Sequence, residues 1–94
     1  MTEPLEEDAL NLALAALDGW KHEGHALRKR FVFADFREAM MFLVRLSYEA
    51  EALGHHPEIH NVYKTVDLAL TTHDAGNRVT AKDVELAAAI ESFL

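Results

Sequence analysis

The fold is decided by residues 35–57, which read DFREAMMFLVRLSYEAEALGHHP. Apolar residues recur in this stretch at the i, i+3, i+4, i+7 spacing of one helix face. Asp35 is a suitable N-cap, Gly54 can adopt the left-handed conformation that often ends a helix, and Pro57 prevents the helix from resuming. The sequence therefore predicts a long amphipathic helix that presents two adjacent histidines at its end. Its apolar stripe is predicted to comprise Phe36, Ala39, Met40, Leu43, Leu46, Ser47, Ala50 and Leu53.

Two features of the sequence favour self-association. Met41 and Phe42 fall outside the apolar stripe, so both are expected to be exposed and to hint at a subunit interface. A chain of 94 residues also has a small core and little stability to spare as a monomer. We therefore expect a homo-oligomer.

The residues before the long helix predict another helix and a β-hairpin. Between residues 4 and 17 apolar side chains recur at helical spacing. A short strand is expected at 20–22 and a longer strand at 26–33, joined by a turn at 23–24. In the longer strand apolar and polar side chains alternate, as in an antiparallel sheet covered on one side. Lys29 is the exception on the apolar face.

The residues after the long helix predict extended structure and then a third helix. Residues 58–72 are rich in strand-forming side chains but contain no glycine or proline to mark a turn. His73 is expected to end the last strand, and residues 74–77 to form a loop. Thr80, followed three residues later by Asp83, is typical of a capping box at a helix start. The apolar stripe of this helix is predicted to comprise Leu86, Ala89, Ile90 and Phe93.

The composition argues against several classes of function. The formal net charge is -7, and the one basic run, Arg28-Lys29-Arg30, alternates with apolar residues as on a strand, so direct nucleic-acid binding is not expected. The absence of cysteine excludes disulfides and thiolate chemistry. No apolar stretch is long enough to span a membrane, and the acidic N-terminus is unlike a secretory signal. A soluble cytoplasmic protein is therefore expected.

Residues able to carry chemistry gather after residue 50. Imidazole side chains titrate near neutral pH, which suits them to moving protons, and nearby carboxylates can orient them. The sequence thus predicts a proton-transfer site near the end of the long helix. Its candidate residues are Glu51, His55, His56, Tyr63, His73 and Asp83.

Five of these six candidates also have a structural explanation. His55 and His56 could stabilise the last carbonyls of the helix. Asp83 could serve only the N-terminus of the last helix, Tyr63 could be a core aromatic, and Glu51 could be a solvated charge. The three remaining histidines are expected at the surface, and they are His22, His25 and His60.

The chain resembles the pterin-4a-carbinolamine dehydratase family in a spaced motif and over most of its length. The resemblance includes the leading helix, the Gly19-Trp20 step and the closing helix. It departs at Ile59-His60, where members of the family commonly carry an aromatic residue, and this puts the detailed shape of the pocket wall in question. The motif reads Glu51-x3-His55-His56-Pro57-x5-Tyr63-x9-His73-x9-Asp83.

The resemblance completes the predicted fold. It implies two antiparallel strands within residues 58–72, with a turn near 63–65. The resulting order is α-β-β-α-β-β-α, an α+β fold in which three helices cover one face of a four-stranded antiparallel sheet. Residues 1–94 are expected to form a single domain.

The resemblance also implies an activity. Members of the family are hydro-lyases that dehydrate 4a-hydroxytetrahydropterin to quinonoid dihydropterin and water, with no metal or other cofactor. The substrate forms when an aromatic amino acid hydroxylase uses its pterin, so such a hydroxylase is an expected partner in the pathway. The family forms dimers and tetramers, which agrees with the expected homo-oligomer. The implied site consists of catalytic His55, His56 and His73, with His55 and His73 transferring protons and His56 also binding the pterin; Tyr63 contacts the substrate, and Glu51 and Asp83 support the histidines.

Two other classes of function stay open. Histidines and carboxylates could hold zinc or iron, although adjacent His55 and His56 cannot easily both face one ion from a helix end. A non-enzymatic interaction module is the second class, because animal members of the family also bind a transcription factor as a dimerisation partner. A pterin-binding role other than hydroxylase recycling belongs with this alternative.

Overall fold

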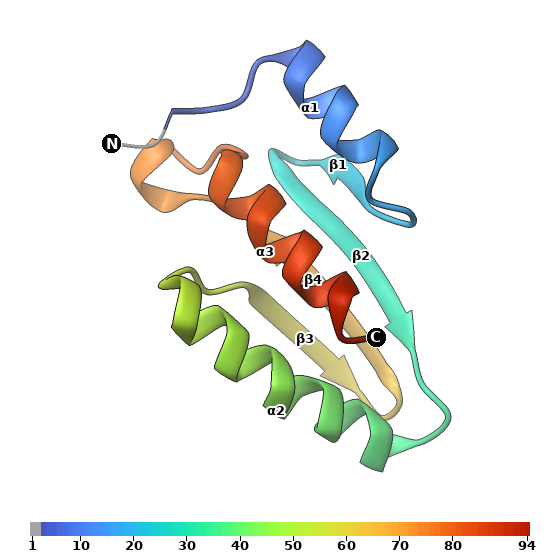
Figure 1. Ribbon diagram of the computed structural model, residues 1–94. Coiled ribbons are helices and arrows are strands. Elements are labelled where there is room, and N and C mark those ends of the chain that lie inside the picture. The colour runs from blue at the N-terminus through green and yellow to red at the C-terminus, as the bar shows by residue number, and fades with distance from the viewer. Residues whose placement is uncertain (1–2) are drawn as a thin grey trace.

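The computed structural model describes residues 3–94 and has the predicted order of elements, with one additional short helix (Figure 1). No helix among these residues combines the length and apolar character needed to cross a membrane. The elements are α1 (Glu7–Ala15), β1 (Lys21–Glu23), β2 (Ala26–Val32), α2 (Phe36–Leu53), β3 (Glu58–Val62), β4 (Thr65–Leu70), the 3-10 helix η1 (His73–Ala75) and α3 (Ala81–Ser92).

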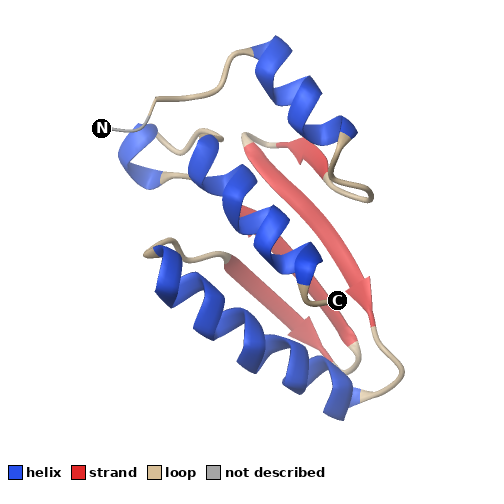
Figure 2. Cartoon of the chain, in the orientation of Figure 1, coloured by secondary structure: helices blue, strands red, loops and turns tan. Residues whose placement is uncertain are grey.

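The four strands form one antiparallel sheet in the order β1-β2-β4-β3. In the middle of the sheet, Val66 of β4 pairs with Phe31 on one side and with Asn61 on the other. The three helices lie on one face of this sheet (Figures 1 and 2). The α+β fold predicted from the sequence is confirmed.

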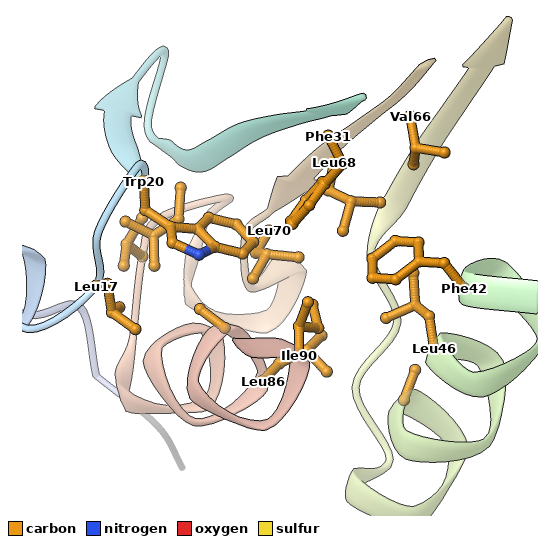
Figure 3. Packing of buried hydrophobic residues seen from close by; sticks show 14 of the residues in the cluster. Leu17, Trp20, Phe31, Phe42, Leu46, Val66, Leu68, Leu70, Leu86 and Ile90 are labelled. Atoms are coloured by element: carbon orange, nitrogen blue, oxygen red, sulfur yellow. The ribbon is translucent and has the colours of Figure 1, made fainter. Parts of the chain in front are cut away.

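The core lies between the sheet and the helices (Figure 3). α1 contributes Leu10 to it, and the segment after α1 contributes Leu17 and Trp20. Burying a leucine or isoleucine side chain stabilises a fold by about 1.5 to 3 kcal/mol. The largest apolar side chains that are fully buried are Leu27, Leu46, Leu68, Leu70, Leu86, Ile90 and Val66.

The first helix is shorter than predicted. α1 begins at Glu7 and not near Pro4, because Pro4 forms a β-bridge with Thr80 and the backbone N–H of Leu5 donates to the carbonyl of Val79 at 2.9 Å. The segment before α1 therefore lies beside the segment before α3, and its backbone is not free to join the helix.

The hairpin turn lies one residue later than predicted. Glu23 pairs with Ala26, which leaves Gly24 and His25 as the two turn residues. Both have positive φ, 59° and 62°, as a type I′ turn requires. Trp20 was expected in the first strand but precedes it, with its side chain buried in the core.

Lys29, the exception in the strand pattern, connects the hairpin to the last helix. Its Nζ lies 2.8 Å from Glu91 Oε2 and donates to the carbonyl of Asp18 at 3.0 Å. Trp20 Nε1 donates to the same Glu91 oxygen at 2.9 Å. A Cβ on Gly19 would lie 3.0 Å from Lys29 Cε, so glycine leaves the space through which the lysine passes.

The prediction that Phe42 is exposed was wrong, whereas Met41 is exposed as expected. Phe42 packs against Phe31 and Phe33, with ring centroids 5.0 Å apart in each case, and against Phe93 at 5.7 Å. This aromatic cluster joins α2 to the sheet and to the end of α3.

The buried face of α2 is consequently rotated relative to the predicted stripe. Phe36 and Leu53, placed in the stripe by the sequence, are 48% and 36% exposed. α2 carries apolar side chains around much of its circumference, so spacing alone predicts the helix but not the face that meets the sheet. The buried residues are Ala39, Phe42, Leu46 and Ala50.

The end of β4 also differs from the prediction. β4 ends at Leu70, and His73 does not end the strand but begins η1. The chain is held there by a β-bridge in which the N–H of Thr72 donates to the carbonyl of Arg78 at 3.0 Å. His73 therefore projects from a tight turn.

α3 begins where the sequence predicts. The Thr80 side chain accepts from the N–H of Lys82, and Asp83 completes the capping box. Of the predicted stripe, Leu86 and Ile90 are fully buried, whereas Ala87 replaces Ala89 at the centre of the contact.

Candidate active site

The three predicted histidines His55, His56 and His73 line one cleft of about 410 Å³. The cleft lies where the end of α2 and the start of β3 meet η1 and the start of α3, all at one end of the molecule (Figure 1). Residues 18 positions apart in the sequence are therefore brought together by the turn at Gly54 and by η1. The other lining residues are Gly54, Pro57, Glu58, Thr71, Thr72, Asp74 and Lys82.

His55 is held by the end of α2 and by α3. Gly54 takes the left-handed conformation predicted for it, with φ 64°, and the N–H of His55 bonds to the carbonyl of Ala50 at 3.0 Å. The imidazole is only 11% exposed, and its Nε2 lies 2.5 Å from Asp83 Oδ1. Because a carboxylate only accepts, Nε2 carries the proton and Nδ1 is the ring atom that can take up another.

Asp83 combines both roles that the sequence left open. It is fully buried, and its Oδ2 accepts from the N–H of Thr80 at 2.9 Å and from the hydroxyl of Thr72 at 2.8 Å. Its Oδ1 accepts from His55. A buried carboxylate is costly unless its oxygens are hydrogen-bonded, and here three donors satisfy it. The helix cap and the histidine partner are the same side chain.

His56 is bound by Glu51 across the end of α2. Its Nε2 lies 2.9 Å from Glu51 Oε1, so this imidazole too presents Nδ1 for proton uptake. Unlike His55 and Asp83, both side chains are exposed, His56 by 65% and Glu51 by 81%. Glu51 orients His56 without lining the cleft itself.

His73 is oriented by a residue that the sequence did not single out. Its Nδ1 lies 2.6 Å from Asn77 Oδ1, which makes Nδ1 the donor and Nε2 the proton-accepting atom. Asn77 is in the left-handed region, with φ 59°, and its own N–H bonds to the carbonyl of Thr72 at 3.0 Å. The residue was predicted only as part of a loop. Asparagine four residues after a histidine within a turn is the one signal that could have indicated this contact.

Tyr63 is not brought into this cleft. It forms the turn between β3 and β4, with φ 53° and 60% of its surface exposed. β3 begins beside His56 and ends beside Tyr63, and its five residues span about 17 Å at about 3.3 Å each. A contact between Tyr63 and substrate stays a prediction.

The geometry suits proton transfer. Each histidine has one ring nitrogen bound to an oxygen acceptor, which leaves the other nitrogen to exchange protons with a molecule in the cleft. Lys82 adds a positive charge to the walls, and Glu58 and Asp74 add negative charges. Among residues 3–94, no three histidine, aspartate or glutamate side chains are grouped so that they could hold a metal ion.

Comparison with known proteins agrees with the resemblance. The family model described as Pterin 4 alpha carbinolamine dehydratase matches residues 3–93. A protein from Opitutus terrae named "Putative pterin-4-alpha-carbinolamine dehydratase" is 54% identical over 89 residues, which cover 95% of this chain and 92% of that protein. A protein of the same name from Mesorhizobium japonicum is 48% identical over 90% of this chain and 88% of its own length.

A solved structure shares the fold. The crystal structure titled transcriptional coactivator/pterin dehydratase from Brucella melitensis superposes with a TM-score of 0.89 at 40% identity, and the match covers 95% of this chain and 96% of that one. Identity at this level over nearly the full length, together with the family match, shows common ancestry with these proteins. The chain belongs to the pterin-4-alpha-carbinolamine dehydratase family.

Proposed function

We propose that this protein dehydrates 4a-hydroxytetrahydropterin to quinonoid dihydropterin by general acid and base catalysis at the histidine cleft. The observation that carries the proposal is the convergence of His55, His56 and His73 on one cleft, each with a ring nitrogen held by an oxygen acceptor. The names of the relatives from Opitutus terrae and Brucella melitensis agree with this activity.

The reaction needs two proton transfers. A base removes the proton from N5 of the pterin, and the electron pair left on N5 forms the C4a=N5 double bond. The C4a–O bond breaks at the same time, its electrons stay on oxygen, and an acid protonates that oxygen so that it leaves as water. Positioned acid and base groups accelerate such steps by about 10² to 10⁴.

We assign the two transfers to His55 and His73. Both line the cleft, His55 from the connection before β3 and His73 from the turn after β4. In this assignment the pterin ring lies between them, with one imidazole at N5 and the other at the 4a oxygen. The exposed His56 is suited to binding and orienting the pterin. After each turnover the base carries one proton more and the acid one fewer, and proton exchange with water restores both, since imidazole can gain or lose a proton near neutral pH.

The test is to generate 4a-hydroxytetrahydropterin with a pterin-dependent hydroxylase and to follow its absorbance decay. The wild type should accelerate the decay over the spontaneous rate, and His55→Ala should remove most of that acceleration. His22→Ala is the matched control, because His22 is exposed on β1 outside the cleft. Equal decay with wild type and with buffer would refute the proposed activity.

We further propose that the substrate reaches this enzyme from a pterin-dependent aromatic amino acid hydroxylase. Such an enzyme leaves the 4a-hydroxy product, and dehydration restores a pterin that can be reduced and used again. In coupled assays that contain a reductant for quinonoid dihydropterin, the hydroxylase should sustain its rate at lower pterin concentration when this protein is added.

We also propose that the protein works as a homo-oligomer of two or four chains. β3 lies at an edge of the sheet, which leaves its outer backbone groups available to a second copy. On α2, Met41, Val44 and Tyr48 are 66%, 59% and 73% exposed, and their 3–4 spacing is that of a helix-pairing seam. Tyr48→Glu should lower the sedimentation coefficient. A compact monomer for the wild type at micromolar concentration would contradict this proposal and favour another protein as the occupant of the seam.

A further inference from the structure

Thr72 is one of three buried polar residues between residues 3 and 94, and it precedes His73 directly. It is 4% exposed, and its side chain and backbone make hydrogen bonds in two directions. One direction leads to the partner of His55, and the other leads to the partner of His73.

The side chain of Thr72 is bound to Asp83. Since the carboxylate only accepts, the single hydroxyl proton of Thr72 must point to Asp83 Oδ2, 2.8 Å away. The Thr72 oxygen, 2.7 Å from Thr80 Oγ1, then receives the Thr80 proton, and Thr80 Oγ1 in turn accepts from the N–H of Lys82. Each donor in this series of hydrogen bonds therefore points toward the next residue, from Lys82 through Thr80 and Thr72 to Asp83.

This chain fixes the carboxylate that holds His55. Asp83 Oδ2 is held by Thr72 and by the N–H of Thr80, which leaves Oδ1 pointing at His55 Nε2. Hydrogen bonds to a charged group are about twice as strong as those between neutral groups, so the Thr72 hydroxyl contributes substantially to the orientation of Asp83.

The backbone of Thr72 organises the turn that carries His73. Its carbonyl accepts from the N–H of Ala75 at 3.2 Å and from the N–H of Asn77 at 3.0 Å. The second bond holds Asn77 where its side chain oxygen meets His73 Nδ1. Thr72 thus contacts the hydrogen-bond partner of each histidine, Asp83 for His55 and Asn77 for His73.

We propose that Thr72 is a positioning residue that sets the placement of His55 and His73 relative to each other. The proposal rests on the proposed function, since it assumes that both histidines act on one substrate. Thr72 acts on the histidines through Asp83 and Asn77. Mutation can remove only the hydroxyl contact to Asp83, because the backbone contact to Asn77 persists in any variant that folds.

The experiment compares Thr72→Val, which keeps the shape but loses the hydroxyl, with Thr72→Ser, which keeps the hydroxyl. Mutation of a residue that orients a metal-ligating histidine typically costs about ten- to hundredfold in activity, and we take the same scale for Thr72. We expect a loss of that size in kcat for Thr72→Val, with KM changed less than about threefold, and near wild-type kcat for Thr72→Ser.

A readout independent of activity is the ring nitrogen spectrum of His55. Long-range ¹H–¹⁵N spectra should show protonated Nε2 and bare Nδ1 in the wild type and in Thr72→Ser, and a mixture of tautomers in Thr72→Val. This measurement tests the positioning role even if the dehydratase assay is negative for the wild type, so failure of the inference and failure of the proposed function are distinguishable.

A variant that merely weakens the fold would mimic part of this result. Ile90→Val is the matched control, because it removes one methylene from the core away from the cleft and should leave kcat and the His55 spectrum unchanged. If Thr72→Val prevents folding, Thr72→Cys keeps a weaker donor in a similar volume and should give an intermediate loss. Equal kcat for the valine and serine variants, or an unchanged His55 spectrum in the valine variant, would overturn the proposal.

Discussion

His55 and His56 are neighbours in the chain and each contacts one carboxylate, but the two pairs differ in nearly every physical respect. The imidazole of His55 is 11% exposed, and its partner Asp83 is fully buried and bound by two further donors. The imidazole of His56 is 65% exposed, and its partner Glu51 is 81% exposed. The first pair is fixed by the core, whereas the second is screened by water and can rearrange. Adjacent identical residues are thus held with very different firmness, because one carboxylate partner is buried and hydrogen-bonded and the other is exposed.

The largest effect is expected when the buried pair is broken. In Asp83→Asn the new NH₂ group either meets the N–H of Thr80 as a second donor, or faces His55 Nε2, which can accept only after the imidazole changes tautomer. The free energy of unfolding should fall by about 3 kcal/mol, and the rate about a hundredfold. Urea unfolding and the dehydration assay measure the two losses. Asp74→Asn, in the same cleft but exposed, should change neither quantity appreciably.

A smaller effect is expected when the orientation of His73 is lost. Asn77→Gly removes the acceptor of His73 Nδ1 and tolerates the positive φ at this position. We expect kcat to fall about tenfold, because the imidazole can then adopt either tautomer. Asn77→Asp keeps an acceptor oxygen and should retain most of the activity. Equal rates for the two variants would show that His73 needs no such partner.

A still smaller effect is expected at the exposed pair. Glu51→Gln removes the charge that His56 contacts, but exposed pairs of this kind contribute only about 0.2 to 1 kcal/mol. The rate should therefore change less than about fivefold, and raising the salt concentration should shrink the difference from the wild type further. A loss as large as that of Asp83→Asn would mean that burial does not explain the difference between the two histidines.

The smallest effect is expected at the ion pair between Arg30 and Asp67, which lies on the uncovered face of the sheet. The hydrogen bond from Arg30, and then its charge, hold the pKa of Asp67 below its ordinary value. A lowered pKa means that Asp67 stabilises the fold above pH about 4 and loses this contribution as the pH falls through its folded pKa. The wild type should slightly exceed Asp67→Asn in thermal stability at neutral pH, and the two curves should converge in acid. A difference that grows below pH about 4 would contradict this assignment.

The sequence predicted those elements whose signals are local. The N-cap at Asp35, the left-handed Gly54 and the capping box of Thr80 and Asp83 appear as expected, because each depends on residues within one turn of a helix. Phe42 and the stripe of α2 were misplaced because the choice among several apolar faces depends on the aromatic side chains of other elements.

The candidate site divides in the same way. The motif predicted His55, His56 and His73 as site residues, and the fold places them in one cleft. The motif could not indicate Asn77 or Thr72, because their contacts depend on η1 and on a β-bridge to Arg78 that no periodic pattern encodes. The predicted turn near 63–65 is confirmed and puts Tyr63 at the far end of β3, away from the end where β3 meets the cleft.

The attachment of α3 to distant parts of the chain has a consequence for how the protein is made. α3 supplies Asp83 to His55 and Glu91 to Trp20 and Lys29, and it fills the core with Leu86. A ribosome adds about 5 to 20 residues each second and completes all four strands before α3 emerges. Until then the nascent chain lacks the carboxylate that holds His55 and the last of the three helices that cover its sheet. The contact between His55 and Asp83 and the completion of the core therefore both wait until α3 has been made.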